Sequence, residues 1–477
     1  MALGRGCARQ IGPAVDDNRR SPVAAVGCPK AGREMTVPGT FASTARLLPK
    51  GARNATDLAE HLQMHGHLPV PSCAGPDWRE AFLHEIEASG LLGRGGAGFP
   101  AYLKLRSAAT GRTKVLLVVN AMESEPASAK DATLLHCSPH LVLDGAQLGA
   151  AAISASKVVV CVPDDREYPG CWVDRAVAER RRAGLAEVPV EVARLNGRYV
   201  AGEESALVAA LAAKPGVPGY RPDKSVPLSI GRQGTLVHNA ETLANMALIA
   251  RYGAAWYRAA GTDGTAGTCL VTVSGAVTSP GVFEVGLGTP ISAILQEAGG
   301  LDDAQAVLIG GYGGSWAPLG HLGAGFWPGG LKAIGASIGA GVLLVLAGKA
   351  CGIRETARIA RFMAAESAGQ CGPCLFGLPA IAGDLELIAE GSGDEFVLDR
   401  LMARCGLVSG RGACHHPDGV ARLVRSALAT FSADLAGHLR GRPCAWAARP
   451  TALRFPGTLP ATAAPPERGT SQKARAA

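Results

Sequence analysis

The sequence has few aromatic residues and no long run of basic ones. Phe, Trp and Tyr together make up 5% of the 477 residues, so surfaces on which nucleic-acid bases could stack are scarce. The formal net charge of +7 comes partly from Arg and Lys near the two ends of the chain. Because no basic stripe runs through the sequence, we do not expect it to bind nucleic acid.

Also absent is an apolar segment long enough to cross a bilayer. The most apolar stretch, residues 333–348, is shorter than the roughly 20 residues of a transmembrane helix and contains several glycines. We expect Gly341–Leu346 to form a buried strand instead. The N-terminus lacks the continuous apolar core of a signal peptide. We therefore expect a soluble, cytoplasmic protein with no membrane span, and docking on a membrane complex stays open.

The cysteines do not have the pattern of a disulfide framework. There are 13 of them, an odd number, and most are scattered along the chain. Only Cys371, Cys374, Cys405 and Cys414 lie close together in the sequence. This distribution favours a reducing compartment and a metal site over structural disulfides.

The order of helix and strand patterns between residues 77 and 252 predicts an α/β domain. We expect strands at Lys114–Val119, Lys157–Val162 and Val188–Ala193, with a helix at Pro139–Ser154 joining the first two. Strands that alternate with helices form a mostly parallel sheet. Ligands of such sheets bind at the loops beyond the strand ends.

Two smaller domains are expected after it, at residues 265–330 and 350–440. The first contains short strand patterns at Leu270–Gly275, Gly281–Val285 and Ala306–Ile309, with one helix at Ile291–Ala298. The second is mostly helical in pattern, with short connections, which is typical of a four-helix bundle. Its expected helices are Ile353–Ala365, Leu375–Ala389, Glu395–Cys405 and Pro417–Leu435.

Both ends of the chain lack a folding pattern. Residues 1–76 have mixed charge, many Gly and Pro and little periodicity, apart from a short helical pattern at Asp57–Gln63. Residues 441–477 are rich in Pro, Ala and Arg. We expect both segments to be disordered or poorly ordered, and either Met1 or Met35 can be the true start.

The most distinctive stretch is Gly93–Pro100, which reads Gly-Arg-Gly-Gly-Ala-Gly-Phe-Pro. Glycines let the backbone approach a ligand and adopt positive φ. Exposed N–H groups with a nearby lysine, here Lys104, are suited to binding a phosphate. The stretch lacks the Gly-Lys-Ser/Thr ending of a P-loop. From the residues alone, a phosphate site and a plain turn both remain open.

Two acidic loops follow predicted strands. Asn120–Pro126 comes directly after the first strand, and Glu203-Glu204 precedes a helix that begins near Ser205. Carboxylates at the ends of parallel strands can hydrogen-bond ribose hydroxyls or a carboxamide. An ordinary acidic loop, or glutamates favoured by the helix dipole, would explain the same residues.

Together with Val237–Asn245, these segments resemble the NADH-oxidising flavoprotein subunit family of respiratory complex I (NADH:quinone oxidoreductase). Related subunits of NAD-dependent hydrogenases and formate dehydrogenases share the glycine stretch. The resemblance covers about Asp77 to Leu435 and has the segments in the same order. It implies an α/β flavin domain with a mostly parallel sheet, a small β-grasp domain and a C-terminal helical iron–sulfur domain.

The resemblance implies an NADH dehydrogenase that transfers hydride from NADH to FMN. Electrons would then pass to an iron–sulfur cluster or to a partner such as ferredoxin or a quinone-reductase subunit. Because the cofactor does the chemistry, no catalytic side chain is implied. The implied cofactor-binding residues are Gly93, Arg94, Gly95, Gly96, Ala97, Gly98, Phe99, Lys104, Asn120, Glu123, Glu125, Tyr199, Gly202, Glu203, Glu204, His238, Asn239 and Thr242.

Within this set the family pattern implies separate roles. Asn120, Glu123, Tyr199, Gly202 and Glu203 would contact the flavin. Glu125 and Glu204 would approach the nicotinamide nucleotide, and Phe99 would stack on its adenine. Asn239 and Thr242 would hold the flavin phosphate side. His238 replaces a family Asn, and we assign it no acid–base role.

Some positions depart from the family pattern. Met122 stands where the family has Asp, which removes one hydrogen-bond acceptor from the flavin side. Ala132 replaces an Arg and Ala201 a Cys. Arg221 falls where the family has Lys, in a stretch that aligns poorly, so the choice between NADH and NADPH stays open.

The cysteine region departs most. The family reads Glu-Ser-Cys-Gly-x-Cys-x-Pro-Cys, whereas this chain has Ala368 at the first cysteine position. The implied ligands of a [4Fe–4S] cluster are therefore only Cys371, Cys374 and Cys414. Four thiolates are the usual number.

Several alternatives follow from the missing cysteine. The fourth ligand could be His415, His416, Cys405 or solvent, or the cluster could contain three irons. By spacing alone the cysteines could also form a zinc or redox motif, or three buried thiols with no cluster. For the whole protein, a catalytically degenerate scaffold and an electron-transfer subunit that does not oxidise NADH remain alternatives.

Overall fold

The computed structural model describes residues 45–49, 56–68, 76–110, 115–185, 188–221, 228–262 and 264–447. Met1, Met35 and the predicted tail beyond residue 447 lie outside the described residues. None of the described helices is long and apolar enough to cross a membrane.

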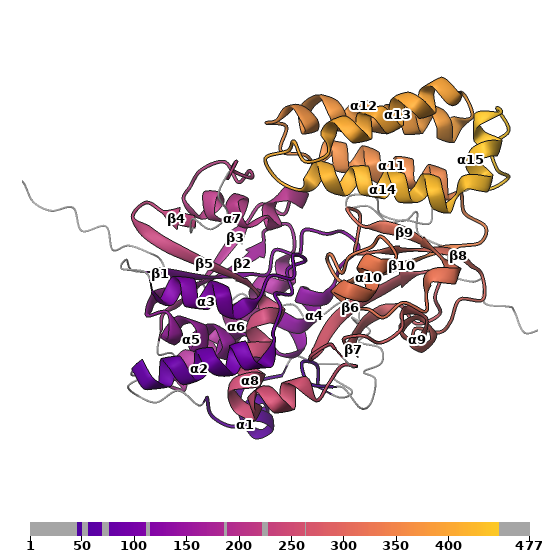
Figure 1. The fold of residues 1–477 in the computed structure, drawn as a ribbon. Helices are drawn as coiled ribbons and strands as arrows, with labels where there is room; N and C mark the ends of the chain where they lie inside the picture. Colours follow the sequence, from indigo (N-terminus) through magenta and orange to yellow (C-terminus); the bar gives the residue numbers. More distant parts are fainter. Residues whose placement is uncertain are drawn as a thin grey trace, which may run out of the picture. The chain divides into compact units, whose positions relative to one another are not determined.

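The first sheet has the order β3-β2-β1-β5-β4 (Figure 1). Neighbouring strands run parallel except β4, which is antiparallel to β5. The strands are β1 Val115–Asn120, β2 Ala155–Pro163, β3 Val190–Leu195, β4 Leu228–Ile230 and β5 Gln233–Asn239. The surrounding helices are α1 Leu58–His65, α2 Pro76–Ser89, α3 Ala101–Ala109, α4 Lys130–Cys137, α5 Pro139–Ala152, α6 Glu167–Arg182, α7 Glu204–Leu211 and α8 Ala240–Arg258. The predicted mostly parallel sheet is therefore confirmed.

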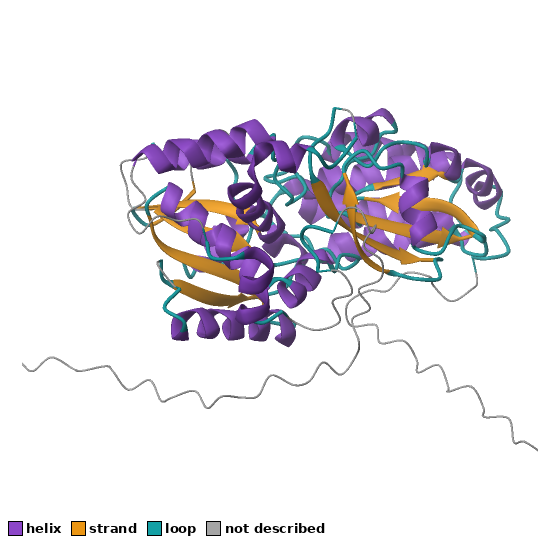
Figure 2. Ribbon diagram, turned by 90° about the horizontal axis from the view of Figure 1, so that it is seen from below, coloured by secondary structure: helices purple, strands orange, loops and turns teal. Residues whose placement is uncertain are grey.

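Both faces of this sheet are covered by helices (Figure 2). Side chains alternate between the faces of a strand, so Leu117 and Val119 join the large core with α2, α5 and α8. Leu116 and Val118 join a smaller cluster with residues of α7. Burial on both faces explains why β1 reads as a continuous apolar run.

Strand β5 was not predicted, although it pairs with β1 near the middle of the sheet. Its sequence mixes Gly234, Thr235 and His238 with only two large apolar residues. The pairing with β1 aligns Asn120 with Asn239. The ends of two neighbouring strands thus place two amide side chains next to each other.

Part of the N-terminal segment expected to be disordered is folded. Residues 46–48 donate backbone N–H groups to the buried carboxylate of Glu284. Helix α1 begins with a capping box made by Asp57 and Glu60, and His61 contacts Asp144 at 2.8 Å. The short helix expected at Asp57–Gln63 is therefore observed as α1. The expectation of disorder does not hold for residues 46–48, because their backbone has a buried polar partner.

The second sheet has the order β7-β6-β10-β8-β9. Its elements are β6 Thr268–Gly275, β7 Gly281–Gly286, β8 Ala304–Ile309, β9 Ser315–Pro318, β10 Val342–Ala347, α9 Ile291–Glu297 and α10 Pro328–Ala333. The predicted range 265–330 does not include β10, which lies in the middle of the sheet and is the buried strand expected at Gly341–Leu346. Strand β9 was not predicted.

The third part is helical (Figure 1). It contains α11 Gly352–Ala365, α12 Leu378–Glu390, α13 Glu395–Val408, α14 His416–Thr430 and α15 Ser432–Leu439, with a π-helical turn at Pro373–Gly377. The helix expected over Pro417–Leu435 is interrupted at Phe431, whose ring packs against Trp316 at 5.3 Å. A short fifth helix follows the four expected ones.

Candidate functional site

Segments that are far apart in the sequence meet at the carboxyl-terminal edge of the first sheet. Asn120 Nδ2 donates to the carbonyl of Gly202 at 2.9 Å, and Asn239 Nδ2 donates to the carbonyl of Asn120 at 3.1 Å. A Cβ added at Gly95 would lie 3.5 Å from the Cβ of Asn239. The glycine stretch, the β1 loop and the turn before α7 therefore form one site, at the edge where parallel sheets bind ligands.

Arg94 anchors the glycine stretch to the residues packed beneath it in the protein interior. Its backbone N–H donates to Thr242 Oγ1 at 2.8 Å, and its guanidinium donates to Tyr257 Oη and to the carbonyl of Thr268, each at 2.9 Å. The side chain is only 4% exposed and lies 3.8 Å from Glu241. The family resemblance implied Arg94 as a binding residue. Its side chain contacts Tyr257, Thr268 and Glu241, and the residue also lines the cavity beside the stretch.

Bare backbone is required at Gly96, where φ is +102°. A Cβ there would lie 3.1 Å from the carbonyl oxygen of Gly339, in the second sheet's domain. Beside the stretch lies a cavity of about 300 Å³. Its walls include Gly93, Gly96, Ala97, Gly98, Lys130, Lys332 and Ser337. Asn120, Glu203 and His238 are not part of its lining.

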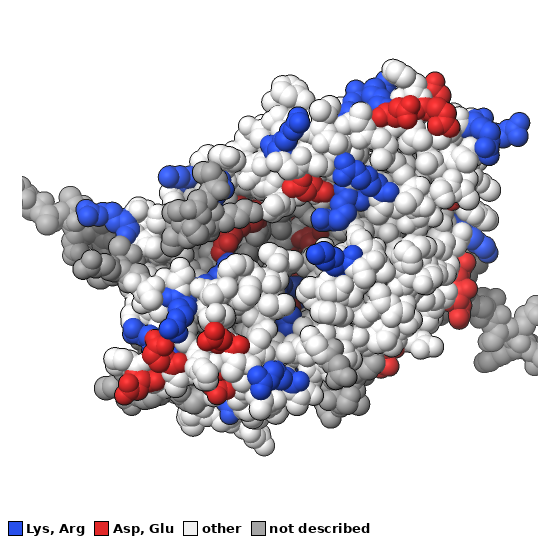
Figure 3. All heavy atoms as spheres, in the orientation of Figure 1, with Lys and Arg blue, Asp and Glu red and all other residues white. Residues whose placement is uncertain are grey.

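One face of the molecule is hollowed near its centre, and carboxylate residues lie inside the hollow (Figure 3). Within the glycine stretch, the side chain of Phe99 is large, apolar and 48% exposed to solvent.

A buried ionic network holds the site in shape. Lys130 Nζ lies 2.8 Å from Asp131 Oδ1 and 3.0 Å from Glu241 Oε2. Asn239 Nδ2 donates to the other Asp131 oxygen at 2.8 Å. Burial alone would lower the pKa of Lys130, but the charges of Asp131 and Glu241 raise it above its usual value. Lys130 therefore stays charged, and it was not among the predicted site residues because its partners meet only in the fold.

The acidic loop after β1 is held by its own carboxylate. Glu123 has a positive φ of 39°, a conformation that residues with a Cβ seldom adopt. Its side chain accepts from the backbone N–H groups of Asp131 and Ala132 at 2.8 and 2.9 Å. The loop also differs from a simple exposed one, since Met122 is fully buried in the cluster with Val118.

Glu125 connects the first sheet's domain to the second. It accepts from the N–H of Tyr312 at 2.9 Å and from the hydroxyl of Tyr199 at 3.1 Å. Burial raises the pKa of Glu125 to about 7, although these hydrogen bonds favour the carboxylate. The carboxyl group is therefore poised to change its protonation state near neutral pH.

Glu203 and Glu204 have different partners. Glu203 is the N-cap of α7 and accepts from the N–H groups of Ser205 and Ala206 at 2.9 and 3.0 Å. Glu204 lies 2.7 Å from Lys104 Nζ, with both side chains about one third exposed. Within the protein, the Glu203 carboxylate caps a helix and the Glu204 carboxylate forms an ion pair.

His238 is buried, and its Nε2 has no hydrogen-bond partner in the described part of the chain. Burial, with the positive charge of Lys104, lowers the pKa of His238 to about 3. The imidazole is therefore neutral. A buried polar atom without a partner is costly, so this nitrogen beside Lys104 is suited to a ligand group.

The cysteines implied as metal ligands lie together, after the end of α11 and before the start of α14. Partial burial opposes ionisation of Cys371, but N–H groups of Ala413 and Cys374 donate to its sulfur and lower its pKa. Burial and then the neighbouring Cys371 raise the pKa of Cys374 to about 12. Cys414 lies near Cys371 and Glu203. The thiols therefore adjoin the same segment that meets Asn120.

This region is fastened to the first domain. Glu366 accepts from the N–H of Tyr199 at 3.0 Å, and Arg198 donates to the carbonyls of Ala365 and Ser367. Ala368, in the place of the missing thiol, follows directly. The fold thus brings the flavin-type loops and the cysteines next to each other.

Three nearby side chains differ in their ability to replace that thiol. Cys405 is fully buried, and the charges of Arg425 and Asp384 act on its thiol. His415 is exposed and contacts Asp418 at 3.2 Å. His416 is buried, hydrogen-bonds the carbonyl of Met363 through Nε2, and has no described partner for Nδ1. Among the three, His416 has a buried nitrogen able to take a ligand.

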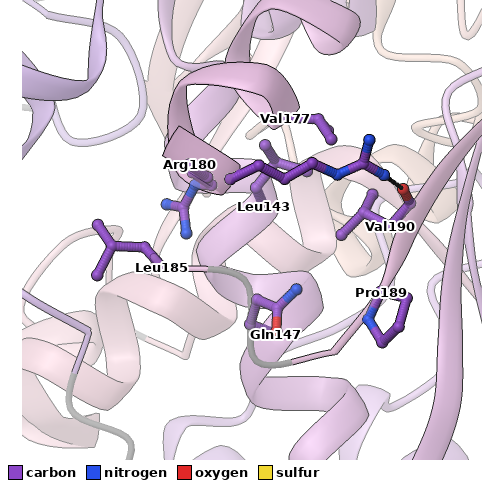
Figure 4. Close-up of a pocket in the computed structure, with 8 residues that line it drawn as sticks. Leu143, Gln147, Val177, Arg180, Leu185, Pro189 and Val190 are labelled. Carbon is purple, nitrogen blue, oxygen red and sulfur yellow. Dashed lines mark hydrogen bonds between the residues drawn. The ribbon is translucent and has the colours of Figure 1, made fainter. Parts of the chain in front are cut away.

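Another pocket, of about 270 Å³, lies between α5, α6 and the start of β3 (Figure 4). Its walls combine Leu143, Val177 and Val190 with the polar ends of Gln147 and Arg180. It is at the amino-terminal edge of β3, opposite to the edge where Asn120 and Asn239 meet. None of the implied binding residues lines it.

Three family models match this chain. Residues 86–248 match the Nuo51 FMN-binding domain, residues 270–314 the SLBB domain, and residues 354–438 the NADH-ubiquinone oxidoreductase-F iron-sulfur binding region. The matched ranges follow the three parts of the fold in order.

Whole-chain relatives agree with these matches. The chain is 31% identical over 394 residues to the F 2 subunit of NADH-quinone oxidoreductase from Rhizobium meliloti (strain 1021), covering 80% of this chain and 93% of that protein. It is 31% identical over 372 residues to the F subunit of NADH-quinone oxidoreductase from Streptomyces coelicolor (strain ATCC BAA-471 / A3(2) / M145), covering 75% and 83%.

A solved structure is also similar. The fold matches a chain of the NAD+-reducing [NiFe]-hydrogenase in the air-oxidized state with a TM-score of 0.71 and 33% identity. The match covers 80% of this chain and 65% of the hydrogenase chain, so it spans slightly less than two thirds of the latter. From the three domain matches and the extent of these relatives, the chain belongs to the family of NADH-quinone oxidoreductase F subunits.

Proposed function

We propose that this chain binds FMN at the carboxyl-terminal edge of its first sheet and oxidises NADH there. The observation that carries the proposal is the hydrogen-bonded meeting of Asn120, Gly202 and Asn239, with Gly95 against them, from separate segments. A chance match to one of these motifs would not predict that the other motifs lie next to it in the fold. When bound, FMN would supply the hydride-accepting ring.

Features of the protein fit such a group. Gly96 lets the glycine stretch pack closely on the backbone of Gly339 and lines the cavity beside the stretch, and the buried nitrogen of His238 has no described protein partner. Asn239 and Thr242 stand at the start of α8, whose N-terminus favours an anion such as a phosphate. The buried charges of Lys130 and Glu241 hold these side chains in place.

The chain's own residues would position rather than react. Neutral His238 has no additional proton to give at neutral pH, which agrees with a hydride transfer that needs no protein acid. Lys104 and Glu204 form a partly exposed pair at the edge of the site, and we propose that Glu204 approaches the nucleotide. Phe99, exposed at the glycine stretch, would stack on the adenine.

Cys371, Cys374 and Cys414 would hold an iron–sulfur cluster by three thiolates. The donor set fits three of the usual four positions, and His416 is better placed than Cys405 or His415 for the fourth. Electrons would leave to a protein acceptor, either a ferredoxin or another redox subunit. The relatives are named as subunits of NADH-quinone oxidoreductases, and the similar structure as a hydrogenase. A cytoplasmic location is part of this proposal.

The test is cofactor analysis with activity on the full-length protein purified without oxygen. We expect a yellow protein that releases FMN on denaturation and reduces an artificial dye with NADH. Parallel assays with NADPH decide which nucleotide is preferred. A colourless protein that cannot be reconstituted with FMN would refute the proposal.

A second candidate function is a non-catalytic scaffold. Ala368 in place of a ligand and Met122 buried where the family has Asp favour it. A scaffold would retain the fold but would not reduce the dye with either nucleotide. Dye reduction therefore separates the two candidates.

A further inference from the structure

A second group of metal-binding side chains lies at the other end of the helical domain. The Sγ atoms of Cys351 and Cys444 and one ring nitrogen of His438 all lie within 4.8 Å of one another. Cys351 and His438 are buried, and Cys444 is half-buried. These residues belong neither to the flavin-type site nor to the Cys371 group, because Cys351 precedes α11, a helix of 14 residues and about 21 Å, whereas Cys371 follows it.

We propose that Cys351, His438 and Cys444 bind a thiophilic divalent cation of the zinc class. Tetrahedral zinc bonds of about 2.3 Å to sulfur and about 2.0 Å to nitrogen place the two ligand atoms about 3.5 Å apart. Cys351 Sγ and His438 Nε2 are 3.4 Å apart. The spacing therefore suits one shared ion, with Cys444 as the third ligand.

The orientation of His438 is already that of a metal ligand. Its Nδ1 is 3.1 Å from the carbonyl oxygen of Ile388. A carbonyl oxygen only accepts, so Nδ1 carries the proton and Nε2 has the free lone pair. Nε2 lies 3.4 Å from Cys351 Sγ and accepts the backbone N–H of Cys444 at 3.4 Å, a long contact that a metal ion would replace. Histidines that bind metals usually donate their other N–H as Nδ1 does here.

The backbone after α15 brings Cys444 back to this point. The N–H groups of Gly441 and Arg442 donate to the carbonyls of His438 and Gly437, each at 3.0 Å. This turn is in the segment expected to be disordered from residue 441, and Cys444, Trp446 and Ala447 instead pack against the helices. A bound ion would join the start of α11 to this last described segment and stabilise the domain.

Asp434 would take the fourth position only after its side chain moved, because its carboxylate is not among the ligand atoms within 4.8 Å of one another. It lies four residues before His438 on α15, and positions i and i+4 share one face of a helix. Its charge also acts on Cys351. Solvent would fill the position if the carboxylate does not reach the ion.

The test measures zinc per chain in the purified full-length protein and in three serine variants. We expect about one zinc per chain in the wild type, loss of most of it in Cys444→Ser, and no change in Cys171→Ser, a half-buried cysteine on α6. Cys414→Ser must also retain the ion, because zinc that depends on Cys414 and not on Cys444 would belong to the other cysteine group and refute the proposal.

A measurement on the wild type alone covers the case in which Cys444→Ser does not fold. Reduced, metal-free protein is titrated with CoCl₂, and thiolate-to-cobalt charge-transfer absorption is expected at one equivalent, with displacement by ZnCl₂. Absence of that absorption, or a Cys351–Cys444 disulfide found by mass spectrometry of protein purified without oxygen, would overturn the proposal. Flavin content is measured in the same samples, so failure of the zinc site is distinguishable from failure of the proposed function.

Discussion

The glycine-stretch site and the Cys371 group are neighbours in the fold, but they are held together in different ways. Around the glycine stretch, buried polar side chains contact one another within the protein itself. Arg94 donates to Tyr257, and Lys130 forms an ion pair with Glu241. In the Cys371 group, three thiols lie near one another without a comparable set of buried ion pairs among the described contacts. A site with an internal network tolerates a changed residue such as Met122, whereas a metal site depends on each ligand separately.

The largest loss of stability at the glycine-stretch site is expected from Lys130→Met. It leaves Asp131 and Glu241 buried without their cation, and loss of one partner from a buried pair typically costs about 3–5 kcal/mol. Thermal or urea unfolding measures the loss. The matched control is Lys157→Met, whose pair with Glu191 is exposed on both sides and should cost at most about 1 kcal/mol. Equal losses in the two variants would show that the buried network is not what holds the site.

The cysteine side is tested by removing one ligand and by restoring another. Cys414→Ser should lower bound iron at least about tenfold, and Ala368→Cys should raise iron content and alter the EPR signal of the reduced protein. Iron analysis after anaerobic reconstitution measures both. If Ala368→Cys matches the wild type in iron and in EPR, the fourth position is already filled by a protein ligand. Double substitution with His416→Ala then decides whether His416 fills it.

A smaller effect is expected from Gly96→Ala. The left-handed backbone conformation costs a residue with a Cβ about 1–2 kcal/mol, and the methyl group would press on the carbonyl of Gly339. Gly184→Ala is the control, since Gly184 also has positive φ but open space around its Cβ position. Gly96→Ala should lose more stability than Gly184→Ala, and only Gly96→Ala should lose flavin. Loss of flavin in both would contradict a local role for Gly96.

The last prediction concerns the pH dependence of stability. Burial raises the pKa of Glu125 to about 7 from its usual value of 4.5. Between these values the folded state holds a proton that the unfolded state releases. Stability from this group is therefore greatest below pH 4.5 and falls as pH rises to about 7, by at most about 1.4 kcal/mol per pH unit.

The control for that prediction is Glu125→Gln, which cannot titrate. The difference in unfolding free energy between wild type and variant should change across this pH window, in the direction that disfavours the wild type at higher pH. A difference that is constant from pH 4.5 to 7 would show that the Glu125 carboxyl does not titrate there.

Local pattern was enough to predict much of the fold. Strand β1 is an unbroken apolar run because helices bury both its faces, and it was predicted within a residue of its bounds. Strand β5 was missed because His238 and Thr235 break its apolar pattern, and its place is decided by pairing with β1. The short N-terminal contacts with Glu284 were missed for a similar reason, since their partner is far away in sequence.

The site was predictable to a different degree. Its glycine and acidic segments were recognisable from their order along the chain, and the fold brings them together. The direction of the Arg94 side chain and the contacts of Lys130 depend on partners from other segments, such as Tyr257 and Glu241. No local spacing encodes those contacts. The Cys351 group was missed because its cysteines are far apart in sequence.

The most direct test of NADH oxidation by a bound flavin is an anaerobic titration of the purified protein with NADH, followed by the visible absorption of the flavin. We predict bleaching that is complete near one NADH per FMN when no acceptor is present, with recovery when a dye is added. A protein that holds FMN but keeps its full absorption with excess NADH and excess NADPH would contradict this prediction.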